Sequence, residues 1–456
     1  MPLLVVLGYV WPEPNSSAAG RRMLSLLQLY REQGWQIIFA SAAEKGPHRF
    51  DLSQWQIEEV SIAINDSAFD HWLQQLQPDV VLFDRFMLEE QFGWRVELAC
   101  PSALRLLDSE DLHCLRAARQ VAWQQQRALH VSDLNAELAQ REIAAIFRSD
   151  VTLTISEFEM QLLQQHYQVP ASQLVYCPFL VEIPAQPNAL SQPQQRPFEH
   201  RQHFVSIGNF RHEPNWRAVL WLKQQIWPLI RAQLPQAELH IYGAYPPPKA
   251  TALHQAAQGF LVKGWASDAC EVMASARLCL APLPFGAGLK GKFIDAMSVG
   301  TPVVTTAVGA EGMTWQQQWC GLIAETAEDI AAAAVRLYQD QTLWLEKQQL
   351  GYQILAHKFA KSSQSAAIWQ QLEDVRANLA EHRQLHFVGA MLRLHHQRST
   401  KFMGQWIEAK NQLAQCKLQY EQIQRELQAQ LDQQAQQQLQ PQQQPQLTGE
   451  QRDAAN

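Results

Sequence analysis

The sequence lacks several features that would place a chain in a class at first sight. Its seven cysteines are scattered along 456 residues and never occur as Cys-x-x-Cys, which argues against a disulfide framework and favours a reducing compartment. No apolar run reaches the roughly 18 residues that suggest a membrane-spanning helix. Lys and Arg form no long block, and the net charge is −7. We therefore expect neither a membrane span nor a nucleic-acid partner.

The start of the chain has no basic segment and only a short apolar run. In MPLLVVLGYVW no Lys or Arg precedes the apolar residues, so the segment is interpreted as a first β-strand and not as a signal peptide. Together with the scattered cysteines, this start predicts a cytoplasmic protein.

The first part of the chain alternates short apolar runs with longer helical patterns. LLVVLGYV, PDVVLFD and VTLTIS are nearly continuous apolar runs, and helical segments such as SAAGRRMLSLLQLYREQG lie between them. This alternation is typical of βαβ units with a parallel sheet that is covered on both faces. Residues 1–183 are therefore predicted to form one Rossmann-like domain.

A change of composition separates this domain from a second one. Residues 184–203 are rich in Pro and Gln without an apolar period, which predicts a linker. The alternation resumes over 204–360 and predicts a second Rossmann-like domain, followed by helical patterns over 361–427. The Gln-rich tract over 428–456 is expected to be disordered or a frayed helix. Two such domains place a ligand cleft at the carboxyl ends of their strands.

The segment FGAGLKGKFIDAM, which follows the apolar run RLCLAPL, combines a flexible backbone with two cations and one acid. Its glycines let the backbone approach a ligand closely, and they are Gly286, Gly288 and Gly291. The helix that starts here offers N–H groups to an anion, and Lys290 and Lys292 add positive charge. Asp295 shares a helix face with Lys292 and suits a ribose next to a diphosphate. A glycine turn with a solvated Lys292–Asp295 pair is the alternative.

The wider segment APLPFGAGLKGKFIDAMSVGTPVVTTAVGAEGM resembles the donor-site signature of glycosyltransferase family 4, the retaining GT-B enzymes. FVSIGNFRHEPNWRAVLWL, LHIYG and LVKGWASDACEVMASARLCLAPL are similar to the same family, so the resemblance is strong over residues 200–325 and looser in the first domain. It implies an α/β protein of the GT-B fold, with two Rossmann-like domains that face each other across a cleft. A C-terminal helical extension follows in this chain.

The resemblance also implies an activity and its partners. We expect an enzyme that transfers a sugar, with retention and without a metal or other cofactor, from a nucleoside-diphosphate sugar. The acceptor is expected to be a carbohydrate, a lipid-linked molecule or a protein, as in polysaccharide biosynthesis. Two rival functions stay open on the same fold: a hydrolysing sugar-nucleotide epimerase, and a nucleotide-sugar-binding protein without turnover.

The donor-site roles of the family carry over to this chain residue by residue. A helix acid before Ala-Met binds the ribose hydroxyls in the family, which implies this role for Asp295. The family usually has a Glu eight positions earlier that touches the donor sugar, and this chain has Ala287 there. The resemblance then implies that backbone amides from Gly286 to Gly288 replace that contact, with Leu289 in the same donor-binding loop.

The family also places cations and strand-end residues around the donor. A basic residue after the first strand of the second domain binds the diphosphate, and Arg211 is the nearest match here. Because the usual Lys after it is absent, Lys290 and Lys292 are the expected substitutes, and Arg211 and Lys292 are assigned to catalysis. Trp265 and Glu311 belong to neighbouring strand-end loops and are expected at the donor, although Glu311 could instead cap a turn.

The first domain offers a loop that the family lays over the donor phosphates. In YVWPEPNSSAAGRRM this resemblance implies that Gly20 and Arg21 lie near the cleft. A solvated helix face that contains Arg21 and Arg22 is the alternative interpretation.

A second polar cluster follows the apolar run ALRLL in the first domain. The family commonly places a His or an acid here against the transferred sugar, which implies His113 first and Asp111 next as catalytic residues, beside Glu110. A structural His is the alternative, and no Cys or second nearby His completes a metal site. Asp84 and Arg85 end another strand and are expected to line the cleft.

Apolar residues continue at helical spacing beyond WQQLEDVRANLA, which resembles the helix that braces the first domain in GT-B folds. They extend through HFVGAMLRLHHQRSTKFMGQWIEAKNQLAQCKLQYEQIQREL. Packing on the enzyme or on another subunit is one interpretation, and it allows a homo-oligomer through these helices. A partner-binding arm is the other.

Overall fold

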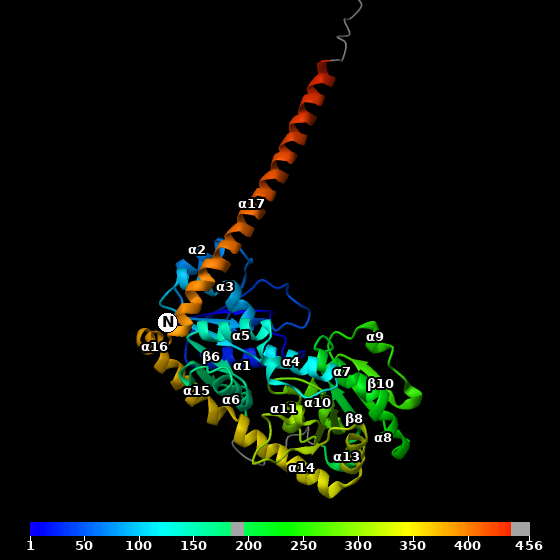
Figure 1. The fold of residues 1–456 in the computed structure, drawn as a ribbon. Coiled ribbons are helices and arrows are strands. Elements are labelled where there is room, and N and C mark those ends of the chain that lie inside the picture. The colour runs from blue at the N-terminus through cyan, green and yellow to red at the C-terminus, as the bar shows by residue number, and fades with distance from the viewer. Residues whose placement is uncertain (184–195, 439–456) are drawn as a thin grey trace, which may run out of the picture. The chain divides into compact units, whose positions relative to one another are not determined.

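The structure is a computed structural model that describes residues 1–183 and 196–438. It divides into two units, residues 1–400 and 401–456. The described residues of the first unit form two parallel β-sheets with helices on their faces (Figure 1). This arrangement confirms the predicted α/β fold with two Rossmann-like domains, followed by a C-terminal helical region.

The first sheet has seven strands within residues 1–183, in the order β3-β2-β1-β4-β5-β6-β7. The strands are β1 (Leu3–Gly8), β2 (Gln36–Ser41), β3 (Glu58–Ser61), β4 (Val80–Asp84), β5 (Leu104–Asp108), β6 (Val151–Thr154) and β7 (Leu174–Tyr176). The helices are α1 (Ala18–Glu32), α2 (Ala68–Leu76), α3 (Phe86–Ala99), α4 (His113–Gln124), α5 (Glu137–Arg148) and α6 (Glu157–Gln165). The order changes direction between β1 and β4, and ligands bind at such a switch point.

The second sheet has six strands within the described part of the second domain, in the order β10-β9-β8-β11-β12-β13. The strands are β8 (Gln202–Ile207), β9 (Leu239–Tyr242), β10 (Phe260–Gly264), β11 (Ala276–Ala281), β12 (Val303–Thr305) and β13 (Gly321–Ile323). The helices are α7 (Glu213–Trp221), α8 (Trp227–Gln233), α9 (Pro248–Thr251), α10 (Ala269–Ser275), α11 (Gly291–Ser298), α12 (Ala307–Ala310), α13 (Ala327–Gln339) and α14 (Gln341–Ile354).

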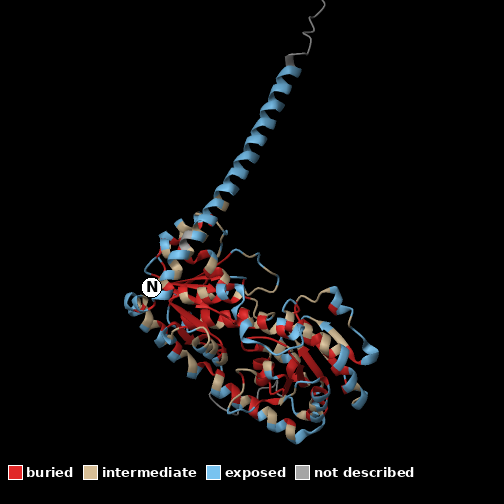
Figure 2. Ribbon diagram, in the orientation of Figure 1, coloured by how far each residue is buried: buried red, intermediate tan, exposed pale blue. Residues whose placement is uncertain are grey.

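The nearly continuous apolar runs of the sequence become the central strands of both sheets. Every residue of β1, β4 and β5 is buried (Figure 2), as expected for parallel strands that helices cover on both faces. Because parallel strands end at one edge of a sheet, the polar residues that follow them gather at that edge.

Three further helices complete the described chain: α15 (Lys361–Ala377), α16 (Leu379–Leu385) and α17 (Phe387–Gln438). Ile368 and Leu372 of α15 join the core around β1 and α1. Trp369 contacts the rings of Tyr30 and Trp35 edge to face. These contacts confirm that α15 braces the first domain, as the resemblance implied.

The two Gln-rich segments lie partly outside the described residues. Of the tract predicted to be disordered or a frayed helix, residues 428–438 continue α17, and residues 439–456 lie outside the description. The same holds for residues 184–195 of the predicted linker, and β8 begins at Gln202 inside the rest of it. None of the described helices is long and apolar enough to span a membrane.

Candidate functional site

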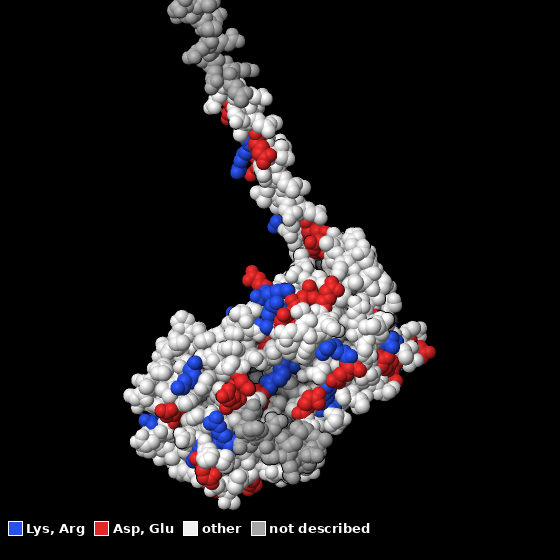
Figure 3. All heavy atoms as spheres, turned by 180° about the vertical axis from the view of Figure 1, so that it is seen from behind, with Lys and Arg blue, Asp and Glu red and all other residues white. Residues whose placement is uncertain are grey.

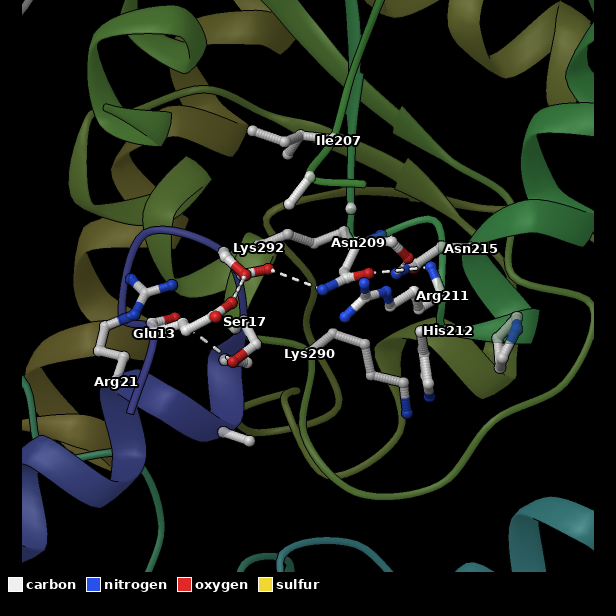
Figure 4. Close-up of a pocket in the computed structure, with 18 of the residues that line it drawn as sticks. Glu13, Ser17, Arg21, Ile207, Asn209, Arg211, His212, Asn215, Lys290 and Lys292 are labelled. Atoms are coloured by element: carbon white, nitrogen blue, oxygen red, sulfur yellow. Dashed lines mark hydrogen bonds between the residues drawn. The ribbon is translucent and has the colours of Figure 1, made fainter. Parts of the chain in front are cut away.

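The carboxyl ends of the two sheets border one cleft of about 840 Å³. The first domain lines it with the β1–α1 loop and the start of α4, and the second domain with the loops after β8, β9, β10 and β11. Figure 4 shows side chains from the β1–α1 segment opposite those that follow β8 and β11. This volume lies in the range of roughly 300–1,000 Å³ that is usual for small-molecule sites.

The segment between β11 and α11 forms one wall of this cleft. Its lining residues are Gly286, Ala287, Leu289, Lys290, Gly291, Lys292 and Asp295. No side chain caps the first turn of α11, which Lys290 precedes, so the first N–H groups of the helix have no side-chain partner. A Cβ on Gly291 would lie 2.6 Å from the Cβ of Ala18, so only glycine allows the two domains to approach here.

Lys290 is buried and Lys292 is half-buried. The Lys290 ammonium donates to the carbonyl of Gly288 at 2.7 Å, and the Lys292 ammonium donates to the Asn215 side-chain oxygen at 2.7 Å. Burial lowers the pKa of Lys290 to about 8, and it lowers the pKa of Lys292 to about 8 as well. The two ammonium groups are therefore charged at neutral pH but poorly solvated, so an anion in the cleft would stabilise them.

The Asp295 carboxylate pairs with a residue of the other domain. Arg21 of α1 donates to both of its oxygens, with 2.9 Å from the second guanidinium nitrogen to Oδ2. Asp295 is 4% exposed and lines the cleft. The alternative of an exposed Lys292–Asp295 pair is wrong, because Lys292 contacts Asn215 instead.

The Gly288 amide has a partner that the sequence did not suggest. It donates to Oε1 of Glu159 on α6 at 2.8 Å, so it is not free for a donor sugar. Gly288 lies outside the cleft lining, and with φ of +60° a Cβ on it would lie 2.7 Å from the Cβ of Asp111. The expectation that the Gly288 amide contacts the donor sugar is therefore wrong. The absence of a side chain at this glycine instead lets the two domains approach each other closely. The segment SEFEMQ is typical of an ordinary helix start, so the sequence contains no signal that singles out Glu159.

Arg211 and Trp265 lie in the cleft lining as the resemblance implied. The Arg211 guanidinium stands 3.6 Å above the ring centroid of Tyr245. Trp265 is 42% exposed, and its indole N–H donates to the carbonyl of Asn15 at 3.3 Å. Both side chains are thus placed to meet a ligand at the mouth of the second domain.

Glu311 and Gly20, by contrast, lie outside the cleft lining. Both oxygens of Glu311 accept from Arg119 of α4 at 2.8 Å, so its side chain joins the two domains, while the residue itself is the C-cap of α12. A Cβ on Gly20 would lie 2.5 Å from the backbone nitrogen of Glu13. Gly20 therefore allows the β1–α1 loop to pack on α1 and acts on the site only through that loop.

The predicted catalytic pair of the first domain lines the cleft together. Nε2 of His113 lies 3.6 Å from Oδ1 of Asp111. Burial lowers the pKa of His113 to about 4 despite this neighbour, so the imidazole is neutral at pH 7. Against the effect of burial, Arg116 holds the pKa of Asp111 well below its ordinary value. Among the described side chains, no three His, Cys, Asp or Glu are placed to hold a metal ion.

Glu110 is a cleft residue to which the sequence assigned no role of its own. It lines the cleft at the end of β5, is 8% exposed, and its Oε1 has no hydrogen-bond partner among the described residues. Burial and the neighbouring Asp108 raise the pKa of Glu110 to about 8, against the opposing effect of Arg22 and Arg85. The buried Asp84 stands behind this cluster outside the lining, whereas Arg85 lines the cleft.

The pH dependence of the free energy of unfolding should show that Glu110 is protonated in the folded chain. Its ordinary pKa is 4.5 and its pKa in the folded chain is about 8, so the folded state holds a proton that the unfolded state loses. The stability that this proton contributes is complete below pH 4.5 and is lost as the pH rises to about 8. Glu110→Gln cannot ionise, so its melting temperature relative to wild type should rise over this window. Glu44→Gln removes an exposed carboxylate as a control, and parallel curves for Glu110→Gln and wild type would contradict the assignment.

Comparisons with known proteins agree with this architecture. Residues 201–340 match the family model described as glycosyl transferases group 1. A comparison with curated protein sequences gives no match.

Solved structures share the two-domain fold of this chain. The sucrose-phosphate synthase of Thermosynechococcus elongatus aligns with a TM-score of 0.61 at 17% identity, over 83% of this chain and 100% of that chain. Anabaena HepE with UDP and glucose aligns with a TM-score of 0.58 at 14% identity, over 81% and 99%. A variant of S. aureus TarM, in a complex that includes UDP, aligns with a TM-score of 0.60 at 10% identity, over 82% and 100%. At these identities the likeness establishes the fold alone.

Proposed function

We propose that this chain, a glycosyltransferase of the GT-B fold with a glycosyl transferases group 1 domain, transfers a sugar from a nucleoside diphosphate to an acceptor hydroxyl with retention. A uridine donor is the first to test, because the HepE and TarM structures contain UDP. The acceptor is proposed to be a carbohydrate, a lipid-linked molecule or a protein.

The observation that carries this proposal is the chemistry of one cleft wall. Lys290, Lys292 and the uncapped start of α11 present positive charge to the cleft, and Asp295 presents a carboxylate one turn further along the helix. Because burial depresses the pKa of both lysines, a diphosphate bound here would replace the solvation that they lack. A nucleoside diphosphate supplies the matching groups, two phosphates beside a ribose with two hydroxyls.

The opposite wall of the cleft is proposed to hold the sugar and the acceptor. His113 and Asp111 face the donor loop from the first domain, and Ala287 leaves the donor side without the carboxylate usual in the family. A neutral His113 has one ring nitrogen that donates and one that accepts, so it can donate a hydrogen bond to a sugar hydroxyl or accept one from it. Glu110 lies beside them as a mostly protonated acid at neutral pH, which suits a hydrogen bond to an acceptor oxygen.

The proposed reaction uses the departing phosphate as the base. The acceptor oxygen bonds to the anomeric carbon while the bond from that carbon to the phosphate oxygen breaks, and the departing phosphate takes the acceptor proton on the same face of the sugar. The enzyme's part is to stabilise the negative charge that develops on the diphosphate. Lys290, Lys292 and Arg211 are the residues proposed to do so.

A panel of nucleotides should identify the donor by thermal stabilisation of the full chain. A ligand at 100 times its dissociation constant adds about 2.7 kcal/mol to the free energy of unfolding. We expect UDP and a UDP-sugar to raise the melting temperature more than uridine, with ADP and GDP as tests of the base. If no nucleoside diphosphate raises it more than its nucleoside does, the donor site is misassigned. UDP release that occurs in water without an added acceptor would favour the hydrolysing epimerase.

A further inference from the structure

The C-terminal helix α17 carries an apolar seam with a strict heptad spacing. Steps of four and three residues alternate along it without interruption. The seam residues, all of them exposed, are Phe402, Trp406, Ala409, Leu413, Cys416, Tyr420, Ile423 and Leu427. In heptad terms the first, third, fifth and seventh of these are d positions and the others are a positions.

This spacing points to another helix as the partner and not to the surface of a globular domain. A helix that packs on a globular core shows a broad apolar stripe with a period of 3.6 residues, whereas a seam of a and d positions alone is the narrow contact of a coiled coil. A seam this regular is also self-complementary, since each a and d layer of one copy meets the same layer of another. An isolated helix in water gains little stability from its own hydrogen bonds, so pairing supplies what this segment lacks.

The residues beside the seam favour a parallel arrangement. Charged side chains of both signs occur along α17 (Figure 3), but the g positions Gln405, Gln412 and Gln419 are uncharged. In a parallel pair they would lie beside the e positions Lys410 and Lys417 of the other copy, which brings no like charges together. An antiparallel pair would place Lys410 of one copy near Lys417 of the other.

We propose that two copies of this chain form a parallel, in-register coiled coil through residues 402–427 of α17. The aromatic side chains of Phe402, Trp406 and Tyr420 can each bury about 150–250 Å². With the aliphatic residues of both copies, the contact is on the order of 1,200 Å² or more, which is the size of specific protein interfaces. The dimer joins two transferase chains through their C-terminal helices, and it is independent of which donor they use.

The mass of the full chain in solution tests the dimer. Wild type should have twice the mass of 52.0 kDa by light scattering, and the double variant Leu413→Glu, Tyr420→Glu should have the single mass. The control Gln415→Glu, Gln422→Glu adds the same charges on the outer face of the helix and should stay dimeric. The melting transition of the first unit should be the same in all three, which excludes a folding defect.

Three outcomes would overturn the proposed two-stranded dimer. A wild-type mass of 52.0 kDa at tens of micromolar would show that α17 packs on its own chain or serves a different partner. A dimer that survives in the Leu413→Glu, Tyr420→Glu variant would place the interface elsewhere. A larger oligomer that the double variant dissolves would overturn the two-stranded form.

Disulfide trapping tests the orientation of the two helices. In the Cys416→Ser background, Phe402→Cys places one thiol near the start of the seam, and Leu427→Cys places one near its end. Each single variant, oxidised by diamide, should form a covalent dimer if the helices are parallel, because identical positions face each other. In an antiparallel pair identical thiols would be about 37 Å apart, at roughly 1.5 Å per residue, and only a mixture of the two variants would crosslink.

Discussion

Asp295→Ala should weaken the binding of UDP by about 1–3 kcal/mol and abolish the preference for a ribose over its dideoxy form. The carboxylate is buried and lines the cleft, so its loss leaves two ribose hydroxyls without acceptors in a partly dry site. Calorimetric titration with UDP and with 2′,3′-dideoxy-UDP measures both quantities. Asp295→Glu should keep the preference, since the resemblance to glycosyltransferase family 4 implies a Glu at this position.

The ion pair with Arg21 calls for a control of its own. Arg21→Gln breaks the pair between the domains but leaves the Asp295 carboxylate in place. If the ribose preference survives in Arg21→Gln and is lost in Asp295→Ala, the carboxylate acts on the ribose itself. If wild type binds UDP and its dideoxy analogue equally well, Asp295 is no ribose ligand and serves only to join the domains.

Lys290→Met and Lys292→Met should each weaken UDP binding by about 1.5–3 kcal/mol, the usual worth of a hydrogen bond to a charged group. Methionine keeps most of the apolar stem and removes only the charge. Uridine lacks the phosphates, so its affinity should change little in either variant. Lys263→Met on the exposed surface of β10 is the matched control.

The same two lysines predict how UDP affinity depends on pH. Their pKa of about 8 in the free chain means that each loses its proton as the pH rises through that value. Affinity for UDP should therefore fall above about pH 8 in wild type, and less steeply in each Lys→Met variant. Equal affinity of wild type and both variants at low salt would contradict the phosphate assignment.

The two-domain fold, and the presence of residues 286–295 at the cleft, could be predicted from local sequence patterns. Apolar runs of strand length between helical segments determine a parallel sheet, because only strands covered on both faces are apolar throughout. Gly286, Gly291, the two lysines and Asp295 lie within ten residues of chain, so their order alone brings them to one cleft wall. The heptad seam of α17 could be predicted in the same way, since its apolar residues repeat along one helix.

Contacts between distant segments could not be predicted in this way. The sequence suggested Lys292 as the partner of Asp295, and only the packing of α1 against α11 brings Arg21 there. Glu311 was expected at the donor, but α4 places Arg119 on both of its oxygens. A side chain's partner depends on which element folds over it, and hydrophobic spacing carries no information about that.

At Glu110, the contribution of local sequence and the contribution of tertiary packing can both be identified. The sequence by itself determined that polar residues follow β5 at the edge of the sheet, where a ligand binds. Its raised pKa depends on the neighbours Asp108, Arg22 and Arg85, which come together only when α1, β4 and β5 are packed. Likewise, the sequence predicted that Gly288 contacts a ligand. In the tertiary structure its amide donates a hydrogen bond to Glu159, because α6 lies against the loop between β11 and α11. Local sequence thus determined the elements and the cleft wall proposed to bind the donor, whereas packing across the domain boundary decided which polar groups of that cleft are already paired.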